Sequence, residues 1–352
     1  MAKITTKLPV NLKDKDRWIF KRRETYDKPV LKTIHRSNIF LSHYGVALNY
    51  LLPVSKTLPN AFGFGLPNSG FIFEFYKKAL EEYLVSRFGK SLELKTLSKD
   101  KEYLLVFSPW MGYFSWVTES LSRLIKTKER HTELTLILPE SYTKKKFVMD
   151  SLKMFPELSY EVIPDGVHMI VPHITIPQLK PFTFVFDPED AKRTRQFVVD
   201  YVKKLQLDIE THDFIYISRE KAKNRKLVNN DEVVQVFKEN GFVELAFENY
   251  NFFEQVHLMN HCKVLSGVHG AGFANIHFLP EGSSMFELIK EYSSVREERP
   301  SYWRLSSALE IDYYIQYCQP KEYGNYDLWV GVDLIVDIND LRANITQIKH
   351  KY

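Results

Sequence analysis

The most informative stretch of the chain runs from Val264 to Glu287: an apolar run, a His-Gly-Ala-Gly turn at residues 269–272, and a second apolar run. Small residues in the turn let backbone N–H groups approach a bulky anion, and a short helix predicted from about Phe273 directs its positive end to the same place. Glu287 is then placed to accept hydrogen bonds from ribose hydroxyls. The stretch predicts a nucleotide phosphate site, and a glycine-rich turn without a ligand is the alternative interpretation.

A second polar cluster follows residues 214–217, where the pattern predicts a short buried strand. A helix is predicted over residues 231–240, so the basic loop between them lies at the carboxyl end of a strand, where open α/β sheets bind ligands. Arg219 and Arg225 in this loop belong to the residue type that pairs with a diphosphate through two parallel hydrogen bonds. A solvated basic loop is the alternative interpretation.

Together these segments resemble glycosyltransferase family 61 over about residues 213–290. The matching residues are Ile217-Ser218-Arg219, Arg225, Asn229, Glu232, Gly241-Phe242, Phe253-Glu254-Gln255, Gly267-Val268-His269-Gly270-Ala271-Gly272, Asn275, Phe278-Leu279-Pro280, Gly282 and Glu287-Leu288. Residues 112–124 resemble the aromatic N-terminal helix of that family more weakly, with Gly112 where Asn is usual and Ser115 where His is usual. A catalytic role for that His therefore does not carry over.

The resemblance implies an α/β fold of two Rossmann-like domains facing a cleft, the GT-B-like arrangement. It also implies transfer of a hexose or pentose from a nucleotide-diphosphate sugar, with a UDP-sugar as first choice, to a glycan acceptor in surface polysaccharide or glycoconjugate synthesis. The transfer is expected to invert the configuration at the anomeric carbon of the sugar, and to need neither a metal ion nor a further cofactor. The predicted donor-binding residues are Ser218, Arg219, Arg225, Asn229, His269, Gly270, Ala271, Gly272, Asn275 and Glu287.

Glu119 and His269 are the predicted catalytic residues. Glu119 lies on the aromatic helix in the half of the chain expected to hold the acceptor, and a partly buried carboxylate there is suited to accept the hydroxyl proton. An ion pair with Arg123, one helical turn away, is the alternative role for Glu119. The next candidates for the base are His168, His173 and Asp187.

Two other classes of protein remain open at this stage. One is a nucleotide- or glycan-binding protein of the same fold without turnover, which the Ser115 departure allows. The other is a Rossmann-type oxidoreductase. The lack of a full G-x-G-x-x-G motif after the first strand counts against it.

Length and net charge limit the classes of protein to which the chain can belong. With 352 residues and a formal net charge of +4, the chain is long enough for two domains and too weakly basic to indicate nucleic-acid binding. We expect domains at residues 1–187 and 188–320. A terminal strand and helix follow at 321–352, and a return of this segment to the first domain is one option.

Because the chain has no apolar leader or span, a cytoplasmic protein is expected, with weak inner-membrane contact through basic residues 13–23 as an option. Cys262 and Cys318 are expected to be buried free thiols.

Overall fold

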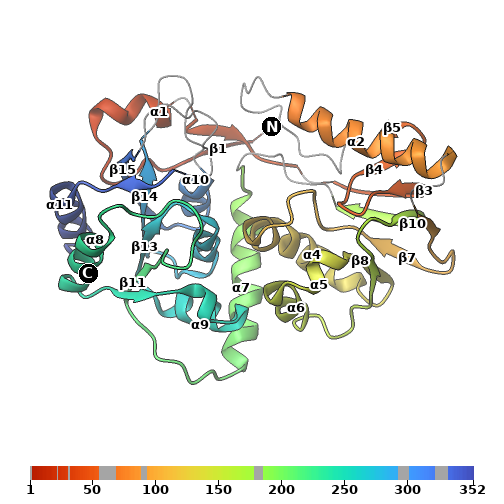
Figure 1. Cartoon of the computed structure of the whole chain (residues 1–352). Coiled ribbons are helices and arrows are strands. Elements are labelled where there is room, and N and C mark those ends of the chain that lie inside the picture. The colour runs from red at the N-terminus through yellow and green to blue at the C-terminus, as the bar shows by residue number, and fades with distance from the viewer. Residues whose placement is uncertain are drawn as a thin grey trace. The chain divides into compact units, whose positions relative to one another are not determined.

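The computed structural model describes residues 2–21, 23–30, 32–54, 69–88, 93–177, 185–291, 301–321 and 332–352, with the backbone alone at 69–73 and 301. The chain divides into two compact units (Figure 1). We call Met1–Lys28 with Asp187–Tyr352 the C-terminal unit, and Pro29–Phe186 the N-terminal unit.

The C-terminal unit is built on a six-stranded sheet of order β12-β11-β13-β14-β15-β16. The strands are β11 (Phe214–Ile217), β12 (Val243–Leu245), β13 (Val264–Val268), β14 (Ser284–Lys290), β15 (Asp312–Pro320) and β16 (Leu334–Ile335). The first five in this order are parallel, as expected, and β16 joins the edge antiparallel. The chain turns to one side after β11 and to the other after β13. The carboxyl ends of these two strands are therefore a topological switch point, the place where open α/β sheets bind ligands.

Helices cover this sheet in two groups. On one face, α8 (Asn230–Glu239) and α11 (Ile338–Lys349) pack apolar side chains such as Phe237 and Ile345 against Phe286 and Tyr314. The other group consists of α7 (Pro188–Lys204), α9 (Phe252–His261), α10 (Ser301–Ala308) and the 3-10 helix η6 (Ala271–Phe278), which contact one another. Helix α11 packs on α8 and is part of the C-terminal unit.

The N-terminal segment also belongs to the C-terminal unit, which differs from the expected domain at residues 1–187. Strands β1 (Lys3–Thr5) and β2 (Thr25–Asp27) pair, and the short helix α1 (Arg17–Lys21) places Phe20 edge-on against Trp303, with 4.8 Å between ring centroids. The apolar side chains Ile19 and Phe20 are buried, so the basic run packs on the protein.

The side chain of Asn11 attaches this segment to strand β15. Its side-chain amide donates to the Ile315 carbonyl at 2.8 Å and accepts from the Ile315 N–H at 3.0 Å, as a neighbouring strand would do. The same amide donates to Asn344 of α11 at 2.8 Å. These bonds link sites far apart in the sequence, and no local pattern indicates them.

The N-terminal unit carries a mixed sheet of order β5-β4-β3-β10-β7-β8-β9, with β6 also paired to β10. The strands are β3 (Thr33–Leu41), β4 (Ala47–Asn49), β5 (Leu52–Pro53), β6 (Leu94–Thr96), β7 (Glu102–Leu104), β8 (Leu134–Pro139), β9 (Tyr160–Ile163) and β10 (His168–Pro177). Strands β3, β4 and β5 run antiparallel, so this half is not the purely parallel Rossmann-like sheet expected. Its helices are α2 (Ser69–Phe88), α3 (Tyr113–Ser115), the π-helical turn η3 (Trp116–Ser120), α4 (Leu121–Thr127), α5 (Glu140–Thr143) and α6 (Lys146–Leu152).

Two further observations concern the whole of the described chain. Cys262 and Cys318 are free and buried, which confirms the expectation. Within the ranges given above, no helix combines the length and apolar character that a bilayer crossing requires.

Replacing Asn11 with Ala removes three hydrogen bonds at the edge of β15 and should lower the free energy of unfolding by roughly 2 kcal/mol. Urea unfolding measures this as a lower midpoint with an unchanged slope. Asn339→Ala is the matched control, because that side chain is exposed. Equal midpoints for the two variants would show that Asn11 does not hold the N-terminal segment in place.

Candidate functional site

The switch point at the carboxyl ends of β11 and β13 brings together the two segments singled out from the sequence. Ile217 at the end of β11 pairs with Gly267 in β13, so the loops that follow these strands begin side by side. Arg219 and Arg225 lie in the first loop and His269 and Gly270 in the second. The structure therefore places the predicted basic loop against the predicted phosphate turn.

Arg219 lies directly against Gly270. A Cβ atom added at Gly270 would clash with Nη1 of Arg219, so the guanidinium would have to move. The φ angle of Gly270 is 179°, an extended conformation open to any residue, so space is what favours glycine there. The guanidinium is fixed in this position because Nη2 donates to the Asn224 carbonyl at 2.7 Å.

Arg225 holds the same turn through a hydrogen bond to its backbone. The residue adopts the left-handed conformation, with φ of 59°, and its Nη1 donates to the His269 carbonyl at 2.7 Å. Burial, and then the neighbouring charge of Arg225, lower the pKa of Arg219 to about 10. Among the described residues no carboxylate forms an ion pair with Arg219, and its buried Nε has no hydrogen-bond partner. Two desolvated cations side by side are the electrostatic setting that an anion stabilises.

Behind the turn, the His269 ring is attached to a buried carboxylate. Its Nδ1 lies 2.5 Å from Oε1 of Glu287, whose other oxygen accepts from the hydroxyl of Tyr313. The Glu287 side chain is 2% exposed and that of His269 is 28% exposed. Glu287 thus lies behind His269 with both oxygens engaged, whereas the sequence suggested that it would face a ribose.

Two tyrosines that the sequence did not indicate contribute to this arrangement. Tyr302 of α10 donates its hydroxyl to the Gly270 carbonyl at 2.6 Å, and its ring lies 5.4 Å from that of His269. Tyr313 of β15 holds Glu287. Both residues come after the glycine-rich stretch, and only the pairing of β14 with β15 brings Tyr313 to Glu287.

Three of the predicted donor-binding residues brace the loops. The Asn229 amide donates to the Val336 carbonyl at 2.9 Å and accepts from the Val336 N–H at 3.1 Å. Asn275 is buried and donates to Gln255 and to the Gly272 carbonyl. The Ser218 hydroxyl accepts from the backbone of Glu220 at 3.4 Å. Ala271 and Gly272 form the first residues of η6, whose leading N–H groups lack intrahelical acceptors.

In the N-terminal unit, Glu119 lies on the π-helical turn η3, and its carboxylate is 3.3 Å from Nη2 of Arg123. Glu119 is 18% exposed and Arg123 only 2%. Burial lowers the pKa of Arg123, against the opposing effect of Glu119. The ion pair that the sequence offered as the alternative role of Glu119 is therefore present. π-Helical turns occur often at functional sites, so the placement remains of interest.

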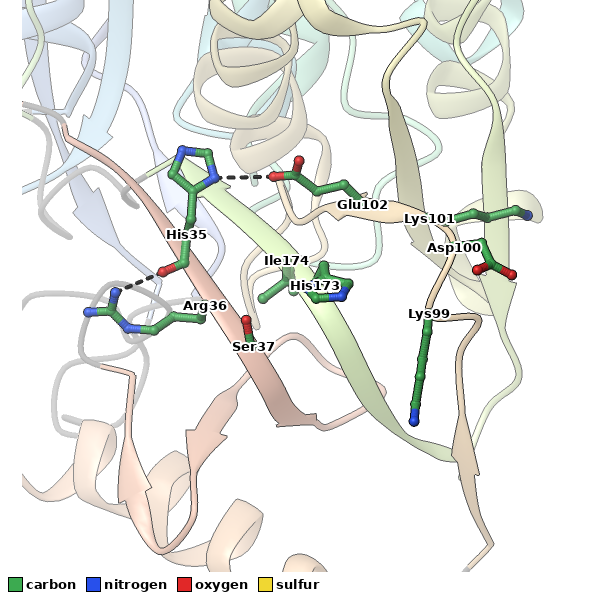
Figure 2. A pocket seen from close by; sticks show the side chains of 9 residues that line it. All are labelled: His35, Arg36, Ser37, Lys99, Asp100, Lys101, Glu102, His173 and Ile174. Carbon is green, nitrogen blue, oxygen red and sulfur yellow. Dashed lines mark hydrogen bonds and ion pairs between the residues drawn. The ribbon is translucent and has the colours of Figure 1, made fainter.

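The other candidate bases have defined surroundings. His168 in β10 is buried, and burial followed by the charge of His43 lowers its pKa to about 4. Asp187 is the N-cap of α7 and accepts from the Glu189 N–H at 3.0 Å. His173 lines an open pocket of about 520 Å³ on the sheet of the N-terminal unit (Figure 2). In that pocket the ring of His35 lies 3.1 Å from Glu102. Among the described residues, His168, His173 and Asp187 form no hydrogen bond or ion pair with another predicted site residue.

Nothing in the described ranges forms a group of three or more His, Cys, Asp or Glu side chains able to hold a metal ion. In the same ranges, Arg219 and Arg225 are the two guanidinium groups that contact the backbone of the turn at 269–272.

Comparison with known proteins identifies the family. Residues 113–286 match the family model named Glycosyltransferase 61. The chain carries a glycosyltransferase 61 domain. That domain contains Glu119, both arginines and the turn at 269–272, while Glu287, Tyr302 and Tyr313 lie beyond it. A segment of 69 residues is 32% identical to the EGF domain-specific O-linked N-acetylglucosamine transferase of Mus musculus, and it covers 18% of this chain and 13% of the mouse enzyme.

Gly270 provides a test of the contact in this glycosyltransferase 61 domain. In Gly270→Ala the new methyl group should displace the Arg219 guanidinium and weaken binding of inorganic pyrophosphate by about tenfold or more, the loss of a charged hydrogen bond. Isothermal titration calorimetry measures the Kd. Gly112→Ala is the matched control, because a Cβ atom there meets nothing within 4 Å. If both variants bind like wild type, Arg219 does not hold the anion.

Proposed function

We propose that the protein is a glycosyltransferase that moves a sugar from a nucleotide-diphosphate donor, with a UDP-sugar as first choice, to a glycan acceptor. One observation carries the proposal: half-buried Arg219, without a carboxylate partner among the described residues, beside Arg225 and against the backbone of Gly270. A diphosphate supplies the anionic partner that Arg219 lacks among the described residues. The family match supports sugar transfer, and the N-acetylglucosamine transferase of the mouse makes UDP-N-acetylglucosamine the first donor to test.

The proposed reaction is a single displacement with inversion. The acceptor oxygen forms a bond to the anomeric carbon while the bond from that carbon to the diphosphate oxygen breaks. The leaving diphosphate keeps the electron pair, and Arg219 and Arg225 stabilise the added charge without a metal ion. The proton of the acceptor hydroxyl passes to a base, for which Glu119 is our first candidate. A GT-B-like arrangement of the two units is part of this proposal and follows from the family resemblance.

Two features bear on the setting of the reaction. The two buried free thiols fit a reducing compartment, which supports the proposal of a cytoplasmic location. A role in surface polysaccharide or glycoconjugate synthesis is part of the proposal and follows from the family resemblance alone. A non-catalytic nucleotide-binding protein of the same fold is the second candidate, favoured by Ser115 at the usual His position. Turnover separates the two, because both should bind the donor.

The central test is a transfer assay with a panel of UDP-sugars and oligosaccharide acceptors, preceded by a thermal-shift screen. A donor at 100 times its Kd should add about 2.7 kcal/mol of stability. Arg219→Ala should weaken UDP binding by about 2 to 5 kcal/mol if the guanidinium contacts a desolvated phosphate. Arg342→Ala is the control, since that residue forms a surface ion pair with Glu239. Unchanged UDP affinity in Arg219→Ala, or turnover that EDTA abolishes and Mn²⁺ restores, would count against the proposed site.

Glu119→Gln tests the base. The substitution keeps the shape and removes the proton acceptor, so kcat should fall by about 10² to 10⁴ with donor affinity nearly intact. Glu133→Gln, on the surface of the same unit, is the control. A simple ion-pair role predicts instead a lower unfolding midpoint with kcat close to wild type. That result would move the search for the base to His168, His173 and Asp187.

A further inference from the structure

We infer that Nε2 of His269 is the ring nitrogen that contacts the donor diphosphate, and that Glu287 and Tyr313 are positioning residues that keep it in that role. The inference rests on the proposed function for the identity of the ligand. The arrangement of the three side chains stands on the structure alone.

The contacts of the ring decide which nitrogen is available. Nδ1 is engaged at 2.5 Å by Glu287, which is 2% exposed and can only accept a hydrogen bond when ionised. Nδ1 therefore carries a proton in both the neutral and the charged ring. Nε2 has no partner among the described residues, and the side chain is 28% exposed. The hydrogen bond at one nitrogen fixes the role of the other.

The backbone of His269 is fixed at the same place. Its N–H donates to the Leu288 carbonyl at 2.8 Å, which extends the β13–β14 ladder by one residue. Its carbonyl accepts from Arg225, whose guanidinium is one of the two cations proposed to hold the diphosphate. The ring of Tyr302 lies 5.4 Å away on α10. The His269 side chain is thus anchored next to the cations by its main chain and by Nδ1.

Tyr313 completes the arrangement from the neighbouring strand. Side chains alternate along β15, so Tyr314 faces α8 and α11 while Tyr313 points to the opposite face, where Glu287 lies. The Tyr313 carbonyl accepts from the Val10 N–H at 2.9 Å. The hydroxyl of Tyr313 occupies Oε2 of Glu287 and leaves Oε1 to His269.

In the charged ring both nitrogens carry protons, so Nδ1–H donates to Glu287 while Nε2–H donates to a diphosphate oxygen. Glu287 and the incoming phosphate then each accept a hydrogen bond from one of the two ring nitrogens. This gives the diphosphate a third donor beside Arg219 and Arg225. The competing explanation is that His269 only satisfies the buried charge of Glu287.

His269→Asn separates the two explanations. The Asn side chain places an N–H near the position of Nδ1 and so retains the contact with Glu287, but nothing replaces Nε2. We expect UDP and inorganic pyrophosphate to bind about tenfold more weakly or worse, with an unfolding midpoint close to wild type. His261→Asn, on the exposed end of α9, is the matched control. Wild-type affinity in His269→Asn would overturn the inference.

The tautomer of the neutral ring gives a second readout that needs no ligand. Imidazole ¹⁵N shifts should show the His269 proton on Nδ1 in the wild type. In Glu287→Gln the Tyr313 hydroxyl should hold the amide oxygen, so that the amide NH₂ faces His269 and the ring proton moves to Nε2. The double variant Glu287→Gln/Tyr313→Phe should free the amide to turn and return the proton to Nδ1. A wild-type ring protonated on Nε2, or a double variant identical to Glu287→Gln, would exclude the positioning role.

These outcomes also separate this inference from the proposed function. If the wild type shows the Nδ1 tautomer but binds neither UDP nor pyrophosphate, the diphosphate site fails and with it the contact of Nε2, although the positioning role stands. If the wild type binds UDP and transfers sugar while His269→Asn binds equally well, the proposed function survives and the inference is wrong.

Discussion

The close approach of the Arg219 guanidinium to the Gly270 backbone is the constraint on which the candidate site depends. It requires two loops that leave neighbouring parallel strands on opposite sides, a residue without a side chain at 270, and a carbonyl at Asn224 that fixes the guanidinium. Arg225 then anchors the next carbonyl along the turn. A second cation so near the first raises the energy of the empty site, and an anion is what relieves it.

Much of this unit could be predicted from the sequence because the signals are local. Alternation of apolar runs and helices predicted β11, β13, β14 and α8, and the parallel pairing of the strands brought Arg219 and the turn at 269–272 together as expected. The aromatic helix was also predicted, although the sequence did not indicate its π-helical turn at 116–120. Short-range periodicity carries this information directly.

What could not be predicted depends on contacts between segments far apart in the chain. Glu287 looked like a ribose ligand because it ends the strand after the glycine-rich turn, but Tyr313 and His269 use its oxygens. Asn229 and Asn275 belong to the family pattern and brace loops in this structure. The antiparallel strands β3, β4 and β5 and the packing of residues 2–28 likewise depend on tertiary pairing that no window of the sequence reveals.

The attachment of Asn11 to Ile315 has a consequence for the order of folding. Pro29–Phe186 forms a continuous unit and can complete its core while the rest of the chain is still being synthesised. The first 28 residues belong with strands made near the end, so they wait without their partners until β15 emerges from the ribosome. The edge of β15 that Asn11 and Val10 cover would be open to pairing with other chains if this segment were displaced. Docking of the N-terminal segment onto the finished strand is therefore the step that closes this edge against aggregation.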